Sequence, residues 1–385
     1  MVDLLLFQKL FARIDDNDEA RLRPLDEHLQ AALEWLLRAS QAVDGQGISK
    51  GYDLLRSRWF PAYPETTGYT VPTLINAARL LGQEEWRSFA HRQAEFLLGQ
   101  VTEEGGVVYW DRTSGQPPLP VVFDTGQVLF GWLAAYRDGS DTRFLEAAAR
   151  SGDWLARHQD KAGMWKKYQH LGVYKVIDAR VAWALLELHR LTGQASHRAA
   201  AVQHLDWVLE QQDADGWFQY CAFTPQEDPF THTIAYTAEG LYRSGELLGE
   251  ERYMAAGKKT ADRLLALLRP DGSLASTYAA GWRASETSSC LTGNVQMSDL
   301  WQSLWLRTRQ PEYQQASLKS LEFVCKTQDL ATDNLNVRGG ISGSYPVYGK
   351  YERLKYPEWA AKFFSDAVLR RKAFEAGRLD ELLPG

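Results

Sequence analysis

Apolar residues recur along this chain at intervals of three and four positions, the spacing that lines up one face of an α-helix. Connections of about 2–6 residues alternate with connections of about 18–30 residues between these segments. The pattern predicts helices over residues 25–40, 65–81, 84–99, 124–137, 142–158, 178–192, 196–211, 230–247, 251–267, 290–308, 312–327 and 357–375.

The short connections join the helices into pairs. Residues 81–84, 191–194 and 248–251 each place a glycine just after a helix, where a left-handed backbone caps the last turn. Residues 137–140 and 307–310 occupy the same place in two further pairs. Each unit is therefore a hairpin of two helices.

The long connections form a repeat. Each begins at Gln, or at Arg in one copy, and continues into a glycine-rich stretch with aromatic residues. The copies begin about 53–59 residues apart, over residues 41–52, 100–110, 159–168, 212–220, 269–278 and 328–345. An amphipathic hairpin cannot bury its apolar face alone, whereas six hairpins closed into a ring hide every inner face. The sequence predicts an all-α (α/α)6 toroid, a single domain over residues 1–385 with residues 1–24 as an N-terminal arm.

Charge and composition exclude several kinds of partner. The chain has 43 Lys and Arg against 49 Asp and Glu, a formal charge of −6, so no positive field attracts nucleic acid. No run of eighteen apolar residues offers a membrane span, and residues 1–13 lack the features of a signal peptide. Cys221, Cys290 and Cys325 show no metal-ligand spacing, so we expect reduced thiols, a cytoplasmic location and no metal or cofactor.

Aromatic residues make up 12% of the chain, as 14 Trp, 17 Tyr and 15 Phe. Such rings fill cores, but their flat apolar faces also stack on sugars. All six long connections of the predicted toroid lie on one rim, and each leads into the N-terminus of an inner helix. We therefore expect a funnel at this rim, with acidic and aromatic walls and an oligo- or polysaccharide as its ligand.

Two aspartates begin successive inner helices at this rim. Asp124 and Asp178 lie one repeat apart, so both side chains can face the funnel. Glycoside hydrolysis uses such a pair of carboxyl groups, one of them kept protonated. The alternative is that each aspartate only caps its helix.

A second set of titratable residues offers different chemistry. His232, Tyr236 and Glu239 share one face of a predicted inner helix, and Glu65 begins another inner helix. Such a group suits proton removal next to a uronate carboxyl, the step that epimerases and lyases share. The competing interpretation is that these are hydrogen-bonded core residues.

Further residues near the rim are candidates for sugar binding. Cations would hold a uronate carboxylate, amides would donate hydrogen bonds, and rings would stack. The candidates are Tyr69, Trp110, Gln127, Trp165, Lys166, Arg180, Trp217, Trp282, Asn294, Gln296, Trp359 and Lys362. Solvated surface charge and packing of the toroid are the alternative roles.

Residues 212–218, Gln-Asp-Ala-Asp-Gly-Trp-Phe, resemble the QW motif of terpenoid-cyclase and prenyltransferase toroids. The resemblance implies toroid architecture. The DxDD acid of squalene-type cyclases is absent, because Asp213-Ala214-Asp215-Gly216 fits a turn better. Cys290 and His232 lack the local partners of a zinc site, so terpene chemistry is not expected.

Other segments resemble carbohydrate-active toroids. Residues 123–126 (Phe-Asp-Thr-Gly) and 177–180 (Ile-Asp-Ala-Arg) are similar to the inner-helix starts of unsaturated glucuronyl hydrolases and related six-hairpin glycosidases. Residues 126–136 and the helix after them resemble the C-terminal toroid of glucuronyl C5-epimerases. Residues 65–69, 232–241, 290–297 and 356–364 look like cytoplasmic toroid proteins associated with bacterial exopolysaccharide biosynthesis.

These resemblances imply a polysaccharide-processing enzyme that hydrolyses a uronate-containing or related glycan by carboxylate acid–base catalysis. One alternative is a uronate C5-epimerase or lyase that uses the His/Tyr/Glu set. The other is a non-catalytic glycan-binding or assembly protein, with polysaccharide-synthesis machinery as its partner. The sequence does not separate the three.

Overall fold

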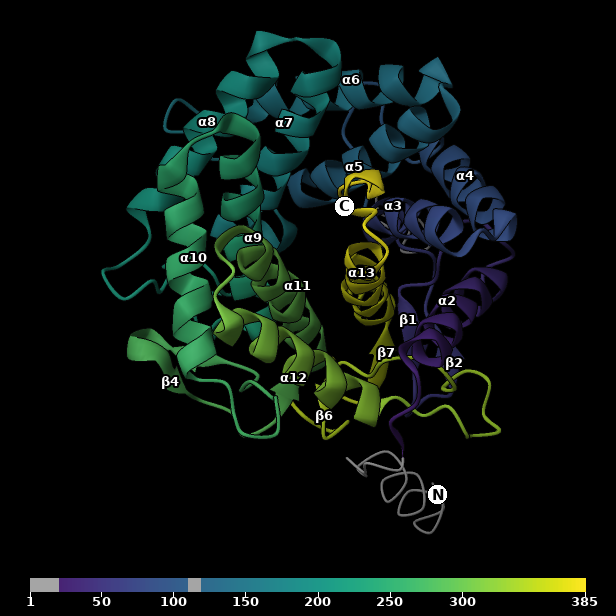
Figure 1. Ribbon diagram of the computed structural model, residues 1–385. Coiled ribbons are helices and arrows are strands. Elements are labelled where there is room, and N and C mark those ends of the chain that lie inside the picture. The colour runs from purple at the N-terminus through teal and green to yellow at the C-terminus, as the bar shows by residue number, and fades with distance from the viewer. Residues whose placement is uncertain (1–20, 110–118) are drawn as a thin grey trace.

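The computed structural model describes residues 21–109 and 119–385, and its main elements are α-helices arranged in a ring (Figure 1). These helices are α2 (Leu25–Gln41), α3 (Pro64–Leu81), α4 (Glu84–Leu98), α5 (Val122–Gly139), α6 (Thr142–His158), α7 (Ala179–Thr192), α8 (Ala195–Glu210), α9 (Thr231–Leu248), α10 (Glu251–Ala266), α11 (Leu291–Thr308), α12 (Pro311–Thr327) and α13 (Glu358–Glu375). Each coincides with a predicted helix to within a few residues.

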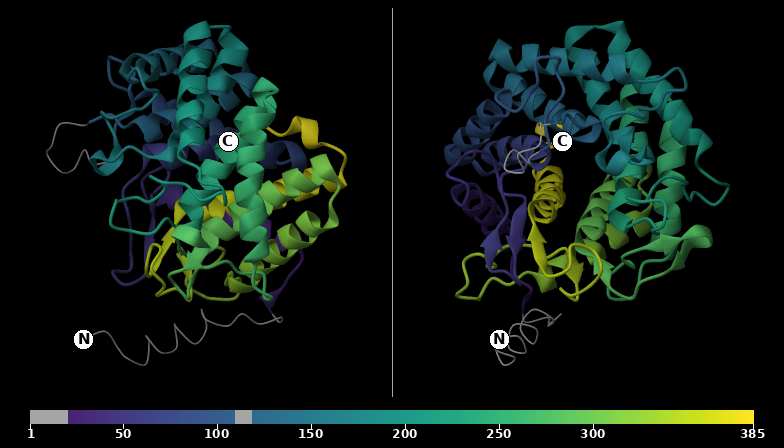
Figure 2. Two further views of the ribbon diagram at one scale, coloured as in Figure 1. Left: turned by 90° about the vertical axis from the view of Figure 1, so that its left-hand side faces the viewer. Right: turned by 180° about the vertical axis from the view of Figure 1, so that it is seen from behind.

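Six inner helices form a closed ring. Each of α3, α5, α7, α9, α11 and α13 contacts the next, and α13 contacts α3. Every inner helix packs on an outer helix, and the hairpin that closes the ring pairs α13 with α2 from the other end of the described chain (Figures 1 and 2). The predicted (α/α)6 toroid is therefore confirmed. Most of the predicted N-terminal arm, residues 1–20, lies outside the described residues.

The short connections end the inner helices as the glycine pattern predicts. Gly82, Gly193 and Gly249 have φ angles of 67°, 70° and 69°, in the left-handed region. The N–H of each donates to the carbonyl four residues earlier, which closes the last helical turn.

The repeated Gln and Gly tie each long connection to the following outer helix. The Gln212 amide donates to the Ala256 carbonyl at 2.9 Å and to the Thr260 hydroxyl at 3.0 Å, both on α10. Gly272 has φ +88°, and a Cβ there would lie 2.2 Å from the Lys319 carbonyl oxygen of α12. The QW-like repeat thus serves the architecture of the toroid.

The long connections also contain short strands that the sequence pattern did not predict. β1 (Gly51–Asp53) pairs with β2 (Arg58–Trp59) and with β7 (Lys355–Pro357), all antiparallel. Two smaller pairs are β3 (Tyr278–Ala279) with β4 (Arg283–Ala284), and β5 (Ser289–Cys290) with β6 (Ser344–Tyr345). Because β1 and β7 belong to the first and last connections, they join the two ends of the ring.

The inner helices are buried over most of their length, and in α9 every residue from Thr231 to Tyr242 is buried. A polar side chain on such a helix must find a partner or face a cavity on the ring axis. Among the described residues, no helix combines the length and the apolar character needed to cross a lipid bilayer.

Candidate active site

A cavity of about 250 Å³ lies at the rim that carries the long connections. Its walls come from the first turns of inner helices and from the connections that precede them. It is lined by carboxyl groups, cations, imidazoles and aromatic rings, among them Lys50, Tyr63, Glu65, Tyr69, Asp124, His170, Lys175, His232, Tyr236, Tyr351 and Trp359. Pockets for drug-sized ligands have roughly 300–1,000 Å³, so this cavity suits a single sugar residue.

Glu65 of α3 and Asp124 of α5 form a hydrogen-bonded pair of carboxyl groups in this cavity. Asp124 is 1% exposed, and burial together with the charge of Glu65 raises the pKa of Asp124 well above its usual value. Burial raises the pKa of Glu65 too, but the Tyr63 hydroxyl donates to Glu65 and the Lys50 charge opposes the shift. At neutral pH we expect Asp124 to hold a proton and Glu65 to be ionised.

Asp178 lies directly behind the cavity wall. Its Oδ2 accepts a hydrogen bond from Gln169, a wall residue, at 2.7 Å, and its Oδ1 has no partner among the described residues. Burial raises the pKa of Asp178 to about 7, although the Lys175 charge acts against the shift.

Helix capping accounts for neither aspartate. Val121 occupies the N-cap position of α5, so Asp124 lies inside the first turn. Asp178 does occupy the N-cap position of α7, but its side chain makes no capping hydrogen bond. Both carboxyl groups are therefore buried without the role that usually explains an Asp at a helix start.

His232 and Tyr236 line the cavity with ring centroids 4.2 Å apart. The His232 Nδ1–H donates to Gln296 Oε1 at 2.7 Å, which leaves Nε2 with its lone pair. Burial lowers the pKa of His232 to about 3, and the Arg180 charge adds to the effect. His232 is therefore a neutral imidazole at physiological pH. Tyr236 shares a hydrogen bond with the Tyr69 hydroxyl.

Glu239 is separated from this group. It forms an ion pair with Arg180 at 2.5 Å, and Arg180, which is 0% exposed, also donates to Gln127 Oε1 at 3.1 Å. The guanidinium lies 4.9 Å from the ring centroid of Tyr236. Arg180, Gln127 and Glu239 thus lie beneath the cavity rather than on its wall.

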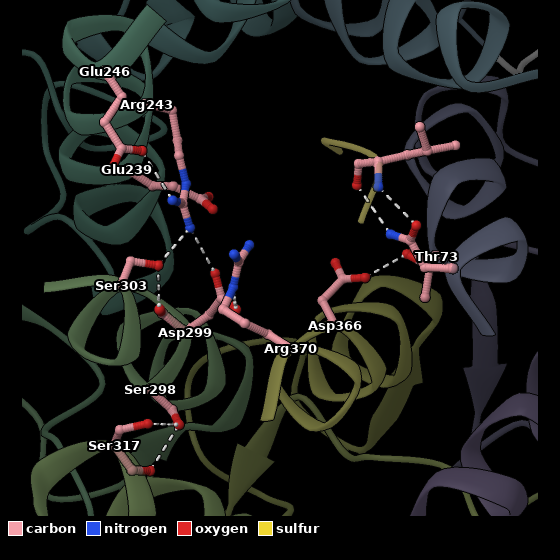
Figure 3. Close-up of polar contacts among 12 residues, drawn as sticks. Thr73, Glu239, Arg243, Glu246, Ser298, Asp299, Ser303, Ser317, Asp366 and Arg370 are labelled. Carbon is pink, nitrogen blue, oxygen red and sulfur yellow. Dashed lines mark hydrogen bonds and ion pairs between the residues drawn. The ribbon is translucent and has the colours of Figure 1, made fainter. Parts of the chain in front are cut away.

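Glu239 faces a second cavity of about 230 Å³ at the opposite end of the ring axis. Figure 3 shows its charged side chains pointing toward the axis from α9, α11 and α13. Arg243 donates to Asp299 at 3.3 Å, Arg370 donates to Asp299 at 2.5 Å, and Asp366 accepts from Thr73 at 2.7 Å. The predicted His/Tyr/Glu set is therefore divided between two cavities.

The predicted aromatic binding residues lie in different surroundings. Tyr69 and Trp359 line the first cavity, at the rim of the long connections, which we call the loop-side cavity. Trp165 and Trp282 are buried and donate to backbone carbonyls at 2.8 and 3.0 Å, so they pack the connections. Trp217 is half-buried and donates to a backbone carbonyl at 3.4 Å. Trp110 lies outside the described residues.

The predicted polar binding residues are mostly engaged elsewhere. Lys166 is exposed and pairs with Asp160 at 2.8 Å, while Lys362 is fully buried and pairs with Asp366 at 2.6 Å. Asn294 donates to the Gly272 carbonyl at 3.0 Å and so anchors a connection. Gln296 orients His232 from behind the cavity.

Several cavity residues were not predicted. Lys50, Tyr63, His170, Lys175 and Tyr351 all belong to long connections, where no periodicity indicates which side chains face the axis. Their only signal is position, since each precedes an inner helix on the rim that carries the long connections. In the described part of the chain, no cluster of three or more His, Cys, Asp or Glu side chains is arranged to hold a metal ion.

No protein-family model matches the sequence. The ent-copalyl diphosphate synthase of Streptomyces sp. (strain KO-3988) is 36% identical over 84 residues, which are 22% of this chain and 16% of that protein.

The turn at 213–217 forms as predicted, because Asp213 accepts hydrogen bonds from the N–H groups of Asp215 and Trp217, both at 2.9 Å.

Solved structures match nearly the whole chain. A cellobiose 2-epimerase from Bacillus thermoamylovorans B4167 has a TM-score of 0.71 and 13% identity over 90% of this chain and 97% of that chain. An unsaturated glucuronyl hydrolase from Bacillus sp. GL1 has a TM-score of 0.72 and 17% identity over 92% and 97%. A sugar epimerase from a ruminal bacterium has a TM-score of 0.73 and 12% identity over 90% and 97%. The chain shares the (α/α)6 toroid fold of these proteins, as the resemblance implied.

Proposed function

We propose that this protein is a carbohydrate-processing enzyme that hydrolyses a glycosidic bond in the loop-side cavity. The observation that carries the proposal is the hydrogen-bonded Glu65–Asp124 carboxyl pair, with Asp124 buried, on the wall of a cavity with aromatic sides. A carboxyl group that keeps its proton at neutral pH is what general-acid catalysis of glycoside cleavage requires.

Asp124 is the acid in this proposal. It donates its proton to the glycosidic oxygen as the bond between that oxygen and the anomeric carbon breaks. Glu65 is in hydrogen-bond contact with Asp124, closer than the roughly 5–5.5 Å that separates the two catalytic carboxyls of a retaining glycosidase. Glu65 therefore acts on Asp124, whose proton it retains, rather than on the sugar.

Asp178 is the second carboxyl group. Its pKa of about 7 leaves a large ionised fraction at neutral pH, and its Oδ1 has no partner among the described residues. In the proposed reaction this carboxylate takes up the proton of the attacking water through an intervening water, because Asp178 lies behind the cavity wall. Gln169 holds the other oxygen and so fixes the orientation of the carboxylate.

One feature supports an acidic substrate. Lys50 and Lys175 both line the cavity, Lys175 with its ammonium held by the His170 and Val173 carbonyls, and a substrate carboxylate would complement the two charges. We therefore retain a uronate-containing or related glycan as the proposed substrate. Exopolysaccharide metabolism in the cytoplasm, with polysaccharide-synthesis machinery as a partner, is part of the same proposal.

One observation favours a second function. His232 is neutral, and its Nε2 lone pair is available in the cavity, so it suits proton removal from a carbon next to a carbonyl or carboxyl group. This step belongs to epimerases and lyases. Tyr236, stacked on His232, would act in the same reaction, whereas Glu239 lies too deep to take part.

Proton NMR of uronate-containing and neutral oligosaccharides in D2O tests the proposal. New reducing ends without a double bond indicate hydrolysis, deuterium at C5 indicates epimerisation, and a new double bond indicates a lyase. Asp124→Asn should reduce hydrolysis by about 10²–10⁴-fold, whereas Asp215→Asn, at an exposed turn, should not.

Full activity of Asp124→Asn together with loss of activity in His232→Ala would show that His232, rather than Asp124, is the catalytic group. Binding of glycans without conversion of any would identify a non-catalytic glycan-binding protein.

A further inference from the structure

Two tyrosines outside the cavity lie in ring contact on the connections that form its wall. Tyr174, in the connection before α7, and Tyr220, in the connection before α9, have ring centroids 5.3 Å apart with an interplanar angle of 41°. Tyr220 is 46% exposed, and Tyr174 is half-buried. Trp207 of α8 lies beneath both, with its centroid 6.1 Å from each. The exposed ring of Tyr220 and the half-buried ring of Tyr174 are thus supported by a side chain on a helix.

The tyrosine pair is continuous with the cavity along both connections. Leu171 lines the cavity and is 60% exposed, and Tyr174 follows it by three residues. Phe223 also lines the cavity, and Tyr220 precedes it by three residues. The Val176 N–H donates to the Tyr220 carbonyl at 3.1 Å, which holds the two connections together. At about 3.8 Å per residue, each tyrosine lies within roughly 11 Å of a wall residue.

The surroundings of the pair suit a glycan. The exposed Lys166 ammonium, which pairs with Asp160 at 2.8 Å, lies near Tyr174. Large exposed aromatic and apolar side chains gathered at one place mark interaction surfaces. The flat apolar face of a ring and its polar edge match the C–H face and the hydroxyl rim of a sugar.

We propose that Tyr174 and Tyr220 form a stacking platform for a sugar residue that lies outside the cavity. The ligand is therefore an oligosaccharide or polysaccharide, with at least one residue on the platform besides the residue in the cavity. This inference rests on the proposed function in one respect, namely that the cavity holds the sugar that reacts.

Isothermal titration calorimetry with sugars of two lengths tests the platform. The ligands are the disaccharide and tetrasaccharide of hyaluronan, which contain glucuronate, and cellobiose and cellotetraose, which are neutral. The wild-type protein should bind the tetrasaccharide of at least one series roughly three- to tenfold more tightly than its disaccharide, the gain expected from one stacked ring.

Tyr220→Ala should reduce this ratio to about one, and Tyr220→Phe should preserve it because the ring remains. Tyr348→Ala is the matched control, because Tyr348 is 50% exposed on the connection before α13. It should leave the ratio unchanged. The series that shows the length effect identifies the glycan as acidic or neutral.

Three results would overturn the platform: an unchanged ratio in Tyr220→Ala, equal affinity of the wild-type protein for both lengths, or no binding of any of the four sugars. Failure of the proposed function has a different signature. If the tetrasaccharide binds through Tyr220 and is never converted, the platform remains and the enzymatic function is wrong.

Discussion

Replacing Glu65 with Gln should move the alkaline limb of the pH–activity profile to lower pH. In the proposed mechanism activity requires protonated Asp124, so activity is lost as pH rises through the pKa of Asp124. The charge of Glu65 contributes to the raised pKa of Asp124. A glutamine removes that charge, and its amide can donate to ionised Asp124, so both effects lower the pKa.

The size of the shift follows from the contact between the two groups. Unit charges about 4 Å apart interact by about 4 kcal/mol at an effective dielectric constant of 20. Glu65 is partly exposed to the cavity, so water screens part of this interaction. At about 1.4 kcal/mol per pKa unit, we expect a downward shift on the order of one to two units. Burial of Asp124 is unchanged, so its pKa stays above the usual value.

The assay is kcat/KM as a function of pH for any glycan that the wild-type protein converts. Glu352→Gln is the control, because Glu352 lines the same cavity but pairs with Lys355 at 2.8 Å. It should move the limb much less. An unmoved limb in Glu65→Gln, or a limb displaced to higher pH, would refute the assignment of Asp124 as the acid held protonated by its neighbour.

Three further predictions concern stability. The pKa of Asp178 is about 7 in the folded protein, whereas the unfolded chain releases this proton at lower pH. The free energy of unfolding of the wild-type protein therefore falls by up to about 4 kcal/mol as pH rises from about 4 to about 7. Asp178→Asn should therefore raise Tm at pH 8 and change it little at pH 4; a lower Tm at pH 8 would indicate a structural role. Gln212→Ala should cost about 1–2 kcal/mol in urea unfolding, because its two hydrogen bonds, one of them to Thr260, are lost. Gly272→Ala should lower the free energy of unfolding by at least about 2 kcal/mol in the same assay, because the φ of +88° and the Lys319 carbonyl both oppose a Cβ. Unchanged stability in the Gln212 or the Gly272 variant would contradict the role assigned to the repeat.

The toroid could be predicted because its information is local and repeated. Helical periodicity, a glycine after several inner helices and a Gln–Gly connection recur in the hairpins, so the copies support one another. Gln212 and Gly272 show the physical basis, since both contact the next outer helix. The strand pair β1–β7 has no such signal, because it joins residues about 300 positions apart over only three residues.

The candidate site could be predicted only where a helix start sets the side-chain direction. Asp124, His232 and Tyr236 lie in the first two turns of inner helices, and all three line the cavity. Glu239 shares the helical face of His232, but seven residues at 1.5 Å each carry it about 10 Å further along the axis. It therefore reaches Arg180 and the second cavity. A shared face alone does not bring side chains into one site.

The two axial cavities differ in how their charges are satisfied. In the second cavity, Arg243 and Arg370 both bond to Asp299, and Glu239 pairs with the fully buried Arg180. Buried ion pairs of this kind hold helices in register, and removing one partner leaves an uncompensated charge that costs several kcal/mol. This network accounts for the second cavity as part of the ring's structure.

The loop-side cavity shows the opposite arrangement. Asp124 and Asp178 are each 1% exposed, and each has one carboxyl oxygen without a hydrogen-bond partner among the described residues. Neither caps its helix, and the raised pKa of Asp178 makes it a net cost to the fold at neutral pH. Carboxyl groups held at such a cost are expected where they transfer protons, since packing alone would favour an amide. The incompletely paired carboxyl groups at the loop-side cavity, compared with the paired charges of the second cavity, therefore favour the loop-side cavity as the proposed active site.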